Sequence, residues 1–300
     1  MSTLTRTGTR PARRPTAGGA VAALVHAVFV VFFALPLLWL LLAATRSGAS
    51  LVRDAPLSPG SLGQLAENWR SLVGFQDAAI LTWVGNSAYY SLAALALTLL
   101  VSIPAGYALA LTRFRARRTL LLTTLVVMLM PNTALVLPVF LEMNAVGLIG
   151  TAAAVVLPFS FFPFGVYLAY IYFSSSISRS LLEAARIDGC GELRLFLHIA
   201  LPLSAPVVAL VGFFSFVQNW NNYFLPFVML PSSDDYPVQI GLSALLSSTP
   251  AFNPSAAGAA VIDLPTLALA TIVSVLPVLL VFAFAQRFLV TGLTAGGVKG

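Results

Sequence analysis

The sequence predicts an all-α membrane protein with six transmembrane helices. Hydrophobic residues make up 59% of the 300 residues and charged residues only 9%, whereas charged residues are about 25% of an average soluble domain. The mean hydropathy is +0.93. Six apolar runs exceed the roughly 20 residues that a helix needs to cross a bilayer, and they lack the strict alternation of barrel strands. The six predicted spans are residues 20–45, 85–111, 119–141, 150–173, 203–230 and 262–289.

The first apolar run follows a basic N-terminal segment, residues 1–17, which we expect to be a flexible cytoplasmic arm. A secretory signal peptide would also begin with basic residues, but its apolar core is only about 7–15 residues long. The run 20–45 is longer, so we expect a retained first helix, with cleavage near Ala43–Ala44 as the alternative. Residues 18–300 then form one six-span domain.

The distribution of charge predicts the orientation of the spans, because Lys and Arg concentrate on the cytoplasmic side of a membrane. With the N-terminus inside, the inner segments contain thirteen of the 16 basic residues, and the outer segments contain seven of the 10 acidic residues. Both termini are therefore expected in the cytoplasm. The sequence pI of 9.9 follows from this topology. Few aromatic residues interleave with the basic ones, so we expect no nucleic-acid partner.

The connections between spans then alternate between the two sides of the membrane. The longest inner connection, residues 174–202, concentrates charges of both signs in a chain that has few to place. Such a cluster marks a surface that contacts something polar. The other inner segments are 112–118 and the tail 287–300, and the outer segments are 46–84, 142–149 and 231–261.

The charged connection contains the segment EAARIDGCGELRLFLHIALPLSAP, which begins at Glu183. Ser180 and Glu183 have the spacing of a capping box that starts a short helix, and Asp188-Gly189 predicts its end, because Gly tolerates the left-handed conformation found there. A second short helix follows, and Pro202 and Pro206 mark the entry into the fifth span. The residues alone also allow a simple amphipathic connector. One apolar side of the second helix is expected to contain Leu193, Phe196, Leu197 and Ala200.

Polar residues within the spans are candidates for a substrate path, since such side chains usually face the bundle interior or a watery cavity. Asn132 lies in the third span, and Gln218, Asn219, Asn221 and Asn222 lie around Trp220 in the fifth. Of these, Asn132, Gln218, Asn219 and Asn222 are the predicted path residues. Amides together with an indole ring suit a neutral, hydroxyl-rich ligand. Hydrogen bonding between helices is the alternative for these residues.

Sequence motifs for catalysis and metal binding are absent. The chain has no G-x-x-x-x-G-K-[ST] phosphate loop, no H-E-x-x-H and no G-x-S-x-G. Its two histidines and the single Cys190 are too few for a metal cluster or an internal disulfide framework. We therefore expect no catalytic residue, no metal and no cofactor bound by this chain, and no ATP hydrolysis by it. Charged side chains are absent from the middle of the spans, which argues against a proton- or ion-coupled carrier.

Several segments resemble one transporter family, the permeases of binding-protein-dependent ABC importers. Glu183-Ala184-Ala185, Asp188-Gly189 and Leu201-Pro202 resemble the EAA loop of these permeases. The segments NWNNYFLPFVML at 219–230 and QRFLVTGLTAGGVKG at 286–300 are similar to the carbohydrate branch, in particular to the smaller permease subunit of the maltose transporter. The resemblance covers most of the chain from about 60 to 300. It departs at Cys190-Gly191, which puts the local cap geometry in doubt.

The resemblance implies a cytoplasmic coupling helix between helices 4 and 5 that docks on a separate ATPase. The ATPase would carry ATP and Mg²⁺. It also implies a second permease subunit, two ATPase subunits, an extracytoplasmic sugar-binding protein facing loop 231–261, and surrounding lipid in a bacterial plasma membrane. Import of a glycerol phosphate ester or a polyamine is the alternative within the family, and a standalone secondary carrier is the alternative outside it. The implied ATPase contacts are Glu183, Ala184, Ala185, Asp188, Gly189, Leu201 and Pro202 in the loop, and Gly296, Gly297 and Lys299 in the tail.

Overall fold

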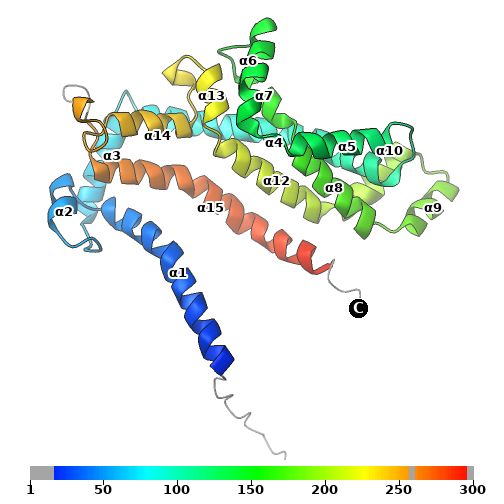
Figure 1. Cartoon of the computed structure of the whole chain (residues 1–300), viewed down its shortest axis with the longest axis horizontal. Coiled ribbons are helices and arrows are strands. Elements are labelled where there is room, and N and C mark those ends of the chain that lie inside the picture. The colour runs from blue at the N-terminus through cyan, green and yellow to red at the C-terminus, as the bar shows by residue number, and fades with distance from the viewer. Residues whose placement is uncertain (1–16, 257–260, 296–300) are drawn as a thin grey trace, which may run out of the picture.

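The computed structural model describes residues 17–256 and 261–295, and these are helical apart from turns and connections (Figure 1). The sequence expectation of an all-helical chain is confirmed for them. The helices are α1 Ala17–Ala43, α2 Gly48–Arg53, α3 Leu62–Gly74, α4 Ala79–Leu111, α5 Arg117–Met128, α6 Val136–Ala145, α7 Ala152–Ser160, α8 Pro163–Ser176, α9 Arg179–Ile187, α10 Glu192–Leu195, α11 Leu201–Leu203, α12 Ala205–Trp220, α13 Phe224–Met229, α14 Val238–Ser247 and α15 Leu264–Ala295, with short helical turns η1 Asn132–Leu135, η2 Phe196–Ala200, η3 Ser233–Asp235 and η4 Pro254–Ala256.

Helix α4 lies along the long axis of the molecule (Figure 1). It packs against α8, α12 and α7, and its 33 residues include thirteen that are buried. The apolar core is divided along this axis. One cluster surrounds Trp83 near the N-terminal end of α4, and a second surrounds Phe173 near its C-terminal end. A third cluster joins α4 to α6, α7 and α13. Helix α4 thus connects the two ends of the molecule.

Four described helical stretches are long and apolar enough to cross a membrane, and the count rises to six if two bent pairs each form one span. The four stretches are Val21–Ala43, Ala79–Leu111, Ala152–Ser176 and Leu264–Phe288, and each overlaps a predicted span. Helix α1 is the least covered of them, because none of its apolar window is buried in this chain. It runs away from the bundle below α2 (Figure 1).

The predicted third and fifth spans are wrong as continuous helices. Residues 119–141 form α5 followed by η1 and α6, with a bend of 102°. The break falls at Pro131, which lacks an N–H and disfavours helical geometry in the residue before it. The predicted fifth span ends as a helix at Trp220, and α13 is a separate short helix. At its start, the chain bends by 78° between Leu203 and Ala205.

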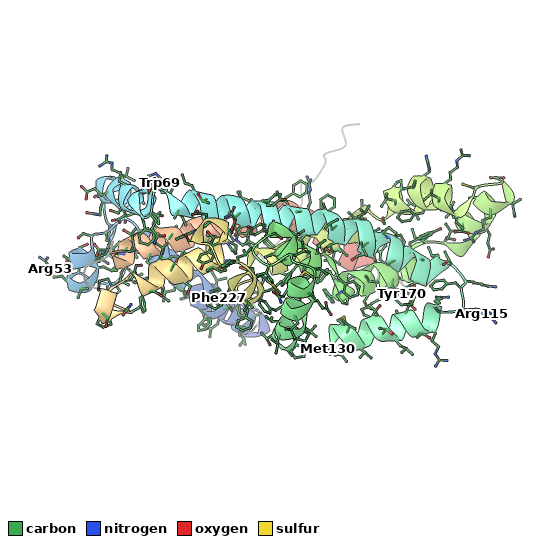
Figure 2. The ribbon with its side chains drawn as sticks, turned by 90° about the horizontal axis from the view of Figure 1, so that it is seen from above. Arg53, Trp69, Arg115, Met130, Tyr170 and Phe227 are labelled. Atoms are coloured by element: carbon green, nitrogen blue, oxygen red, sulfur yellow. The ribbon has the colours of Figure 1, made fainter. Side chains whose placement is uncertain are left out.

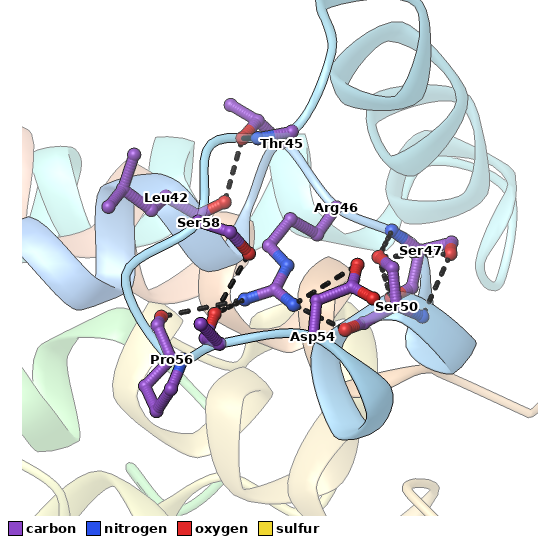
Figure 3. Close-up of polar contacts among 10 residues, drawn as sticks. Leu42, Thr45, Arg46, Ser47, Ser50, Asp54, Pro56 and Ser58 are labelled. Carbon is purple, nitrogen blue, oxygen red and sulfur yellow. Dashed lines mark hydrogen bonds and ion pairs between the residues drawn. The ribbon is translucent and has the colours of Figure 1, made fainter.

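The segment after α1 is held in place by a buried arginine (Figure 3). Arg46 is only 2% exposed. Its guanidinium donates to the carbonyl oxygens of Ser50 and Ala55, and lies 3.7 Å from the carboxylate of Asp54. The amide of Asn68, on α3, donates to the Arg46 carbonyl at 2.9 Å. These bonds hold the end of α1 against α2 and α3. This part of the predicted outer loop 46–84 is therefore folded and not an irregular connection.

Candidate coupling segment and translocation cavity

The charged connection folds as the predicted short helix, turn and second helix, and it lies at one end of the molecule (Figure 1). Helix α9 ends where the sequence predicted. Gly189 has a φ of +83°. Its N–H donates to the Arg186 carbonyl at 3.0 Å, and the N–H of Cys190 donates to the Ala185 carbonyl at 2.9 Å. This pair of bonds is the Schellman arrangement, in which a left-handed residue satisfies the last carbonyls of a helix.

The predicted capping box at the start of α9 is wrong. The helix begins at Arg179, so Ser180 lies within its first turn and cannot act as the N-cap. Ser178 occupies the cap position, but no side-chain hydrogen bond to the free amides is present. The hydroxyl groups of Ser178 and Ser180 instead lie 2.7 Å apart.

The second helix buries only part of the predicted apolar side, since Phe196 and Ala200 pack in the cluster around Phe173 but Leu193 and Leu197 do not. Leu195 and Ala200 are fully buried, whereas Leu193 and Leu197 are 72% and 45% exposed. The reason is the π-helical turn η2, in which the Leu201 N–H donates to the Phe196 carbonyl five residues earlier. A π-turn places residues five apart on one side, and Pro202, without an N–H, cannot continue the regular α pattern.

The docking residues implied by the resemblance lie in two groups. Glu183, Ala184, Asp188 and Gly189 are exposed on α9 and its turn, and Ala185 is half-buried. Leu182 holds the helix to the bundle, since it is 1% exposed within the apolar cluster around Phe173. Leu201 and Pro202 lie in α11, after the π-turn. Gly296, Gly297 and Lys299 lie outside the described residues.

One carboxylate joins the two short helices to α4. The Nε of Arg186 donates to Glu192 Oε1 at 2.8 Å, and the Tyr107 hydroxyl donates to Oε2 at 3.2 Å. The hydrogen bond from Arg186 lowers the pKa of Glu192 below its ordinary 4.5, against an opposing effect of partial burial. A carboxylate with a lowered pKa stays charged at neutral pH. This ion pair therefore persists above pH 4.5 and is lost only as pH falls through the lowered pKa of Glu192.

A polar cavity of about 620 Å³ lies between α9 and the end of α4. Glu183, Arg186 and Glu192 line it from the coupling segment, and Arg113 and Arg117 line it from the turn after α4. Arg117 also caps α4, because its guanidinium donates to the carbonyls of Leu109 and Ala110. Sequence reasoning assigned no individual role to Tyr107, Glu192 or Arg117. The bond between Tyr107 and Glu192 joins segments that are 85 positions apart.

A larger cavity of about 750 Å³ lies in the middle of the molecule, where three helix breaks meet. The breaks are the turn η1 after α5, the junction of α7 and α8 at Phe161-Phe162, and the junction of α12 and α13. Of the four predicted path residues, Asn132, Gln218 and Asn222 line this cavity. Glu142, Asn221 and Tyr223 also line it. The sequence analysis named Asn221 in the polar group around Trp220 but did not include any of these three among the predicted path residues. The Asn-Asn-Tyr run after Trp220 was the signal that would have added two of them.

Asn219 and Trp220 point elsewhere, and the suggestion that the indole ring faces a ligand is wrong. Trp220 is 2% exposed, and its Nε1 donates to the Ser274 carbonyl at 2.9 Å. Asn219 donates to Ser215 Oγ at 3.3 Å, and Ser215 donates to Thr98 Oγ1 at 3.2 Å. Trp220 thus makes a hydrogen bond between helices, the alternative that the sequence analysis kept, whereas Asn219 bonds within α12 to Ser215, which in turn bonds across to α4.

Two sugar-transport permeases are similar to this chain over most of their length. The arabinooligosaccharides transport system permease protein AraQ of Halalkalibacterium halodurans is 35% identical over 277 residues, which cover 91% of this chain and 94% of that protein. The lactose transport system permease protein LacG of Rhizobium radiobacter is 31% identical, with 91% of this chain and 93% of that protein covered.

The fold and the family agree with these relatives. The crystal structure of a bacterial ABC transporter involved in the import of the acidic polysaccharide alginate includes a chain that matches with a TM-score of 0.76 and 25% identity. The match covers 92% of this chain and 99% of that one. Residues 102–294 match the family described as "binding-protein-dependent transport system inner membrane component". The chain therefore belongs to this family, as a multi-pass permease subunit of an ABC importer in the plasma membrane.

Proposed function

We propose that this permease imports a neutral sugar or oligosaccharide that an extracytoplasmic binding protein delivers. The observation that carries the proposal is the lining of the 750 Å³ cavity, where the amides of Asn132, Gln218 and Asn222 lie among apolar and aromatic side chains. Amides both donate and accept hydrogen bonds, and aromatic faces suit the apolar face of a sugar ring. The relatives named for arabinooligosaccharides and lactose support the same class of solute.

The charges of the cavity separate this solute from the alternatives. A glycerol phosphate ester or an acidic sugar calls for Arg or Lys, and the lining contains neither. A polyamine calls for several carboxylates, and the lining contains one, Glu142. Membership of the importer family argues against the alternative of a standalone secondary carrier.

The second part of the proposal concerns the energy source. Helix α9 would dock on an ATPase subunit, with two such subunits in the complex carrying ATP and Mg²⁺. The exposure of Glu183, Ala184 and Gly189 at one end of the molecule supports this role. Gly296, Gly297 and Lys299 in the C-terminal tail are proposed to contact the same ATPases. This end is then cytoplasmic, in keeping with Arg115, which lies at this end of the molecule, opposite Arg53 (Figure 2).

A second permease subunit is the third part of the proposal. The side chains of α1 are broadly exposed, with Phe32 at 70%, and in α5 and α6 Val126 and Leu137 are 62% and 66% exposed. Lipid can cover such surfaces, but the large cavity between α5, α6 and α13 needs a wall on its open side. A related permease packed there would close it.

Uptake measurements test the sugar assignment. Cells that express the full importer are offered labelled arabinooligosaccharides, lactose, maltodextrin, glycerol phosphate and a polyamine. Gln218→Leu and Asn222→Leu are expected to raise the KM for one of the sugars at least tenfold. Asn144→Leu, an exposed residue of α6 outside the cavity lining, is the matched control. Uptake of glycerol phosphate or the polyamine alone would contradict the sugar assignment.

Copurification tests the ATPase contact separately. Glu183→Lys reverses an exposed charge on α9 and is expected to release the ATPase subunits from the permease while the permease stays in the membrane. Asp263→Lys reverses an exposed charge in the loop before α15 and is the control. Equal retention of the ATPase by both variants would refute the contact.

A further inference from the structure

One face of α4 holds the loop between α13 and α14. The residues at positions 83, 86, 87 and 90 recur every three or four positions, so they share one side of the helix. They bind the main chain of the loop and leave the side chain of Asp234 exposed. The bonds are Trp83 Nε1 to the Ser233 carbonyl at 3.0 Å, Asn86 Nδ2 to the Asp234 and Tyr236 carbonyls at 2.7 and 3.1 Å, Tyr90 OH to the Asp235 carbonyl at 2.9 Å, and the Val238 N–H to Ser87 Oγ at 2.8 Å.

The other end of the same helix holds the coupling segment. Tyr107 donates to Glu192, which Arg186 holds in turn. The Tyr107 ring also lies 5.0 Å from the Phe196 ring and 5.6 Å from the Phe173 ring, between centroids. The turn η2 therefore contacts α4 directly through the Phe196 ring, and α9 is joined to α4 through Glu192.

Between these ends α4 is continuous. Its 33 residues correspond to about 50 Å of helix. Pro104 is its one internal proline, and contacts on both sides of it hold α4 to the bundle. Before it, Thr98 Oγ1 donates to the Ser160 carbonyl at 3.1 Å. After it, Gly106 lies so close to α8 that an added methyl group would overlap the Ala169 side chain. These contacts on both sides of Pro104 limit the bending that a proline would otherwise allow.

We infer that α4 is the transmission element of the importer: it keeps the coupling segment and the loop Ser233–Val238 at a constant separation, so that movement of one moves the other. Tyr107 and Glu192 are the positioning residues at the coupling end, and Asn86 and Tyr90 are those at the loop end. The inference rests on the proposed ATPase contact of α9. It adds that movement is transmitted along α4, which contributes no residue to the lining of the 750 Å³ cavity.

Spin labels on the reconstituted importer measure this separation. Leu193 and Asp234 are exposed near the two ends of α4, and Cys190 is the single native cysteine. Leu193→Cys and Asp234→Cys are combined in a Cys190→Ser background, and the distance between labels is measured without nucleotide and after trapping with ATP and vanadate. A second label pair joins Leu193→Cys to Val146→Cys, at the end of α6.

The Leu193–Asp234 distance is expected to stay constant on trapping, while the Leu193–Val146 distance changes. Tyr107→Phe combined with Glu192→Gln keeps the aromatic ring but weakens the link, and should make the Leu193–Asp234 distance depend on nucleotide. Tyr89→Phe, which alters an exposed hydroxyl on the same helix, should not. A Leu193–Asp234 distance that changes in the parent protein, or one that stays constant in the double variant, would overturn the inference. So would constancy of both distances, since nothing would then move relative to α4.

Failure of the inference can be told from failure of the proposed ATPase contact. If Glu183→Lys retains the ATPase, the contact of α9 itself is wrong. If Glu183→Lys releases the ATPase but the Leu193–Asp234 distance changes in the parent, α9 docks as proposed and only the role of α4 is wrong.

Discussion

Replacing Gly189 by alanine is expected to weaken ATPase binding through the backbone alone. Apart from its two chain neighbours, no described residue has an atom within 4 Å of a Cβ at this position, so the substitution creates no clash with them. The φ of +83° is the obstacle, because it lies in a region that L-residues other than glycine rarely adopt. The left-handed conformation costs such a residue roughly 1–2 kcal/mol. If docking needs the observed turn, that cost corresponds to a loss of affinity of roughly 5- to 30-fold.

Two further variants separate backbone strain from contact size. Gly189→Asn is larger than Gly189→Ala, but asparagine tolerates the left-handed region better, so its affinity should fall less. Gly191→Ala is the matched control, since Gly191 has a φ of −70° and also meets no atom within 4 Å. Affinity is measured by titrating the purified ATPase subunit onto the permease in nanodiscs. The reasoning is refuted if Gly191→Ala loses as much affinity as Gly189→Ala, or if asparagine is worse than alanine.

Three other predictions concern the stability of the bundle, measured as the midpoint of thermal unfolding in detergent. Gly106→Ala should destabilise the protein by about 1–3 kcal/mol, because the added methyl group overpacks the α4–α8 crossing. Gly85→Ala lies in open space on the same helix and should leave the midpoint unchanged. Equal midpoints for the two variants would disprove the close crossing. Arg46→Met should cost about 1–3 kcal/mol for each buried partner left unpaired, whereas Arg53→Met, at an exposed site, should leave the midpoint unchanged. Ala78 has a φ of +65°, so Ala78→Gly should raise the midpoint through relief of roughly 1 kcal/mol of strain; a lower midpoint would contradict that conformation.

The membrane spans were predictable wherever their limits depend on local composition. The apolar runs around α1, α4, α7–α8 and α15 predicted helices that the structure contains. The breaks were harder, because hydropathy does not change at them. Pro131 coincides with a bend of 102°, yet Pro104 and Pro277 lie inside continuous helices. Whether a proline breaks a helix depends on what surrounds the freed backbone groups, and a single sequence does not contain that information.

The coupling segment shows the same division between local and distant causes. The end of α9 was predictable because the conformation of Gly189 is decided by two or three neighbouring residues. Its start was not, because Ser180 and Glu183 have the spacing of a capping box, yet the helix begins one residue earlier, at Arg179, with no side-chain cap. The bond from Tyr107 to Glu192 spans 85 positions, and no local pattern indicates which tyrosine approaches the segment.

The helix breaks and the polar cavity have one physical cause. In lipid an unpaired backbone group costs several kcal/mol, so irregular backbone is tolerated only where it is buried in protein or lines a watery space. The three breaks at Asn132, at Phe161-Phe162 and at Asn221-Asn222 all line the same 750 Å³ cavity. The amides there can pair with freed backbone groups or with a bound sugar, whereas Asn219, inside regular helix, donates to Ser215 one turn earlier on the same helix. An amide at a helix break is thus better evidence for a substrate path than an amide within a helix, and by this criterion Asn221 replaces Asn219 among the path residues.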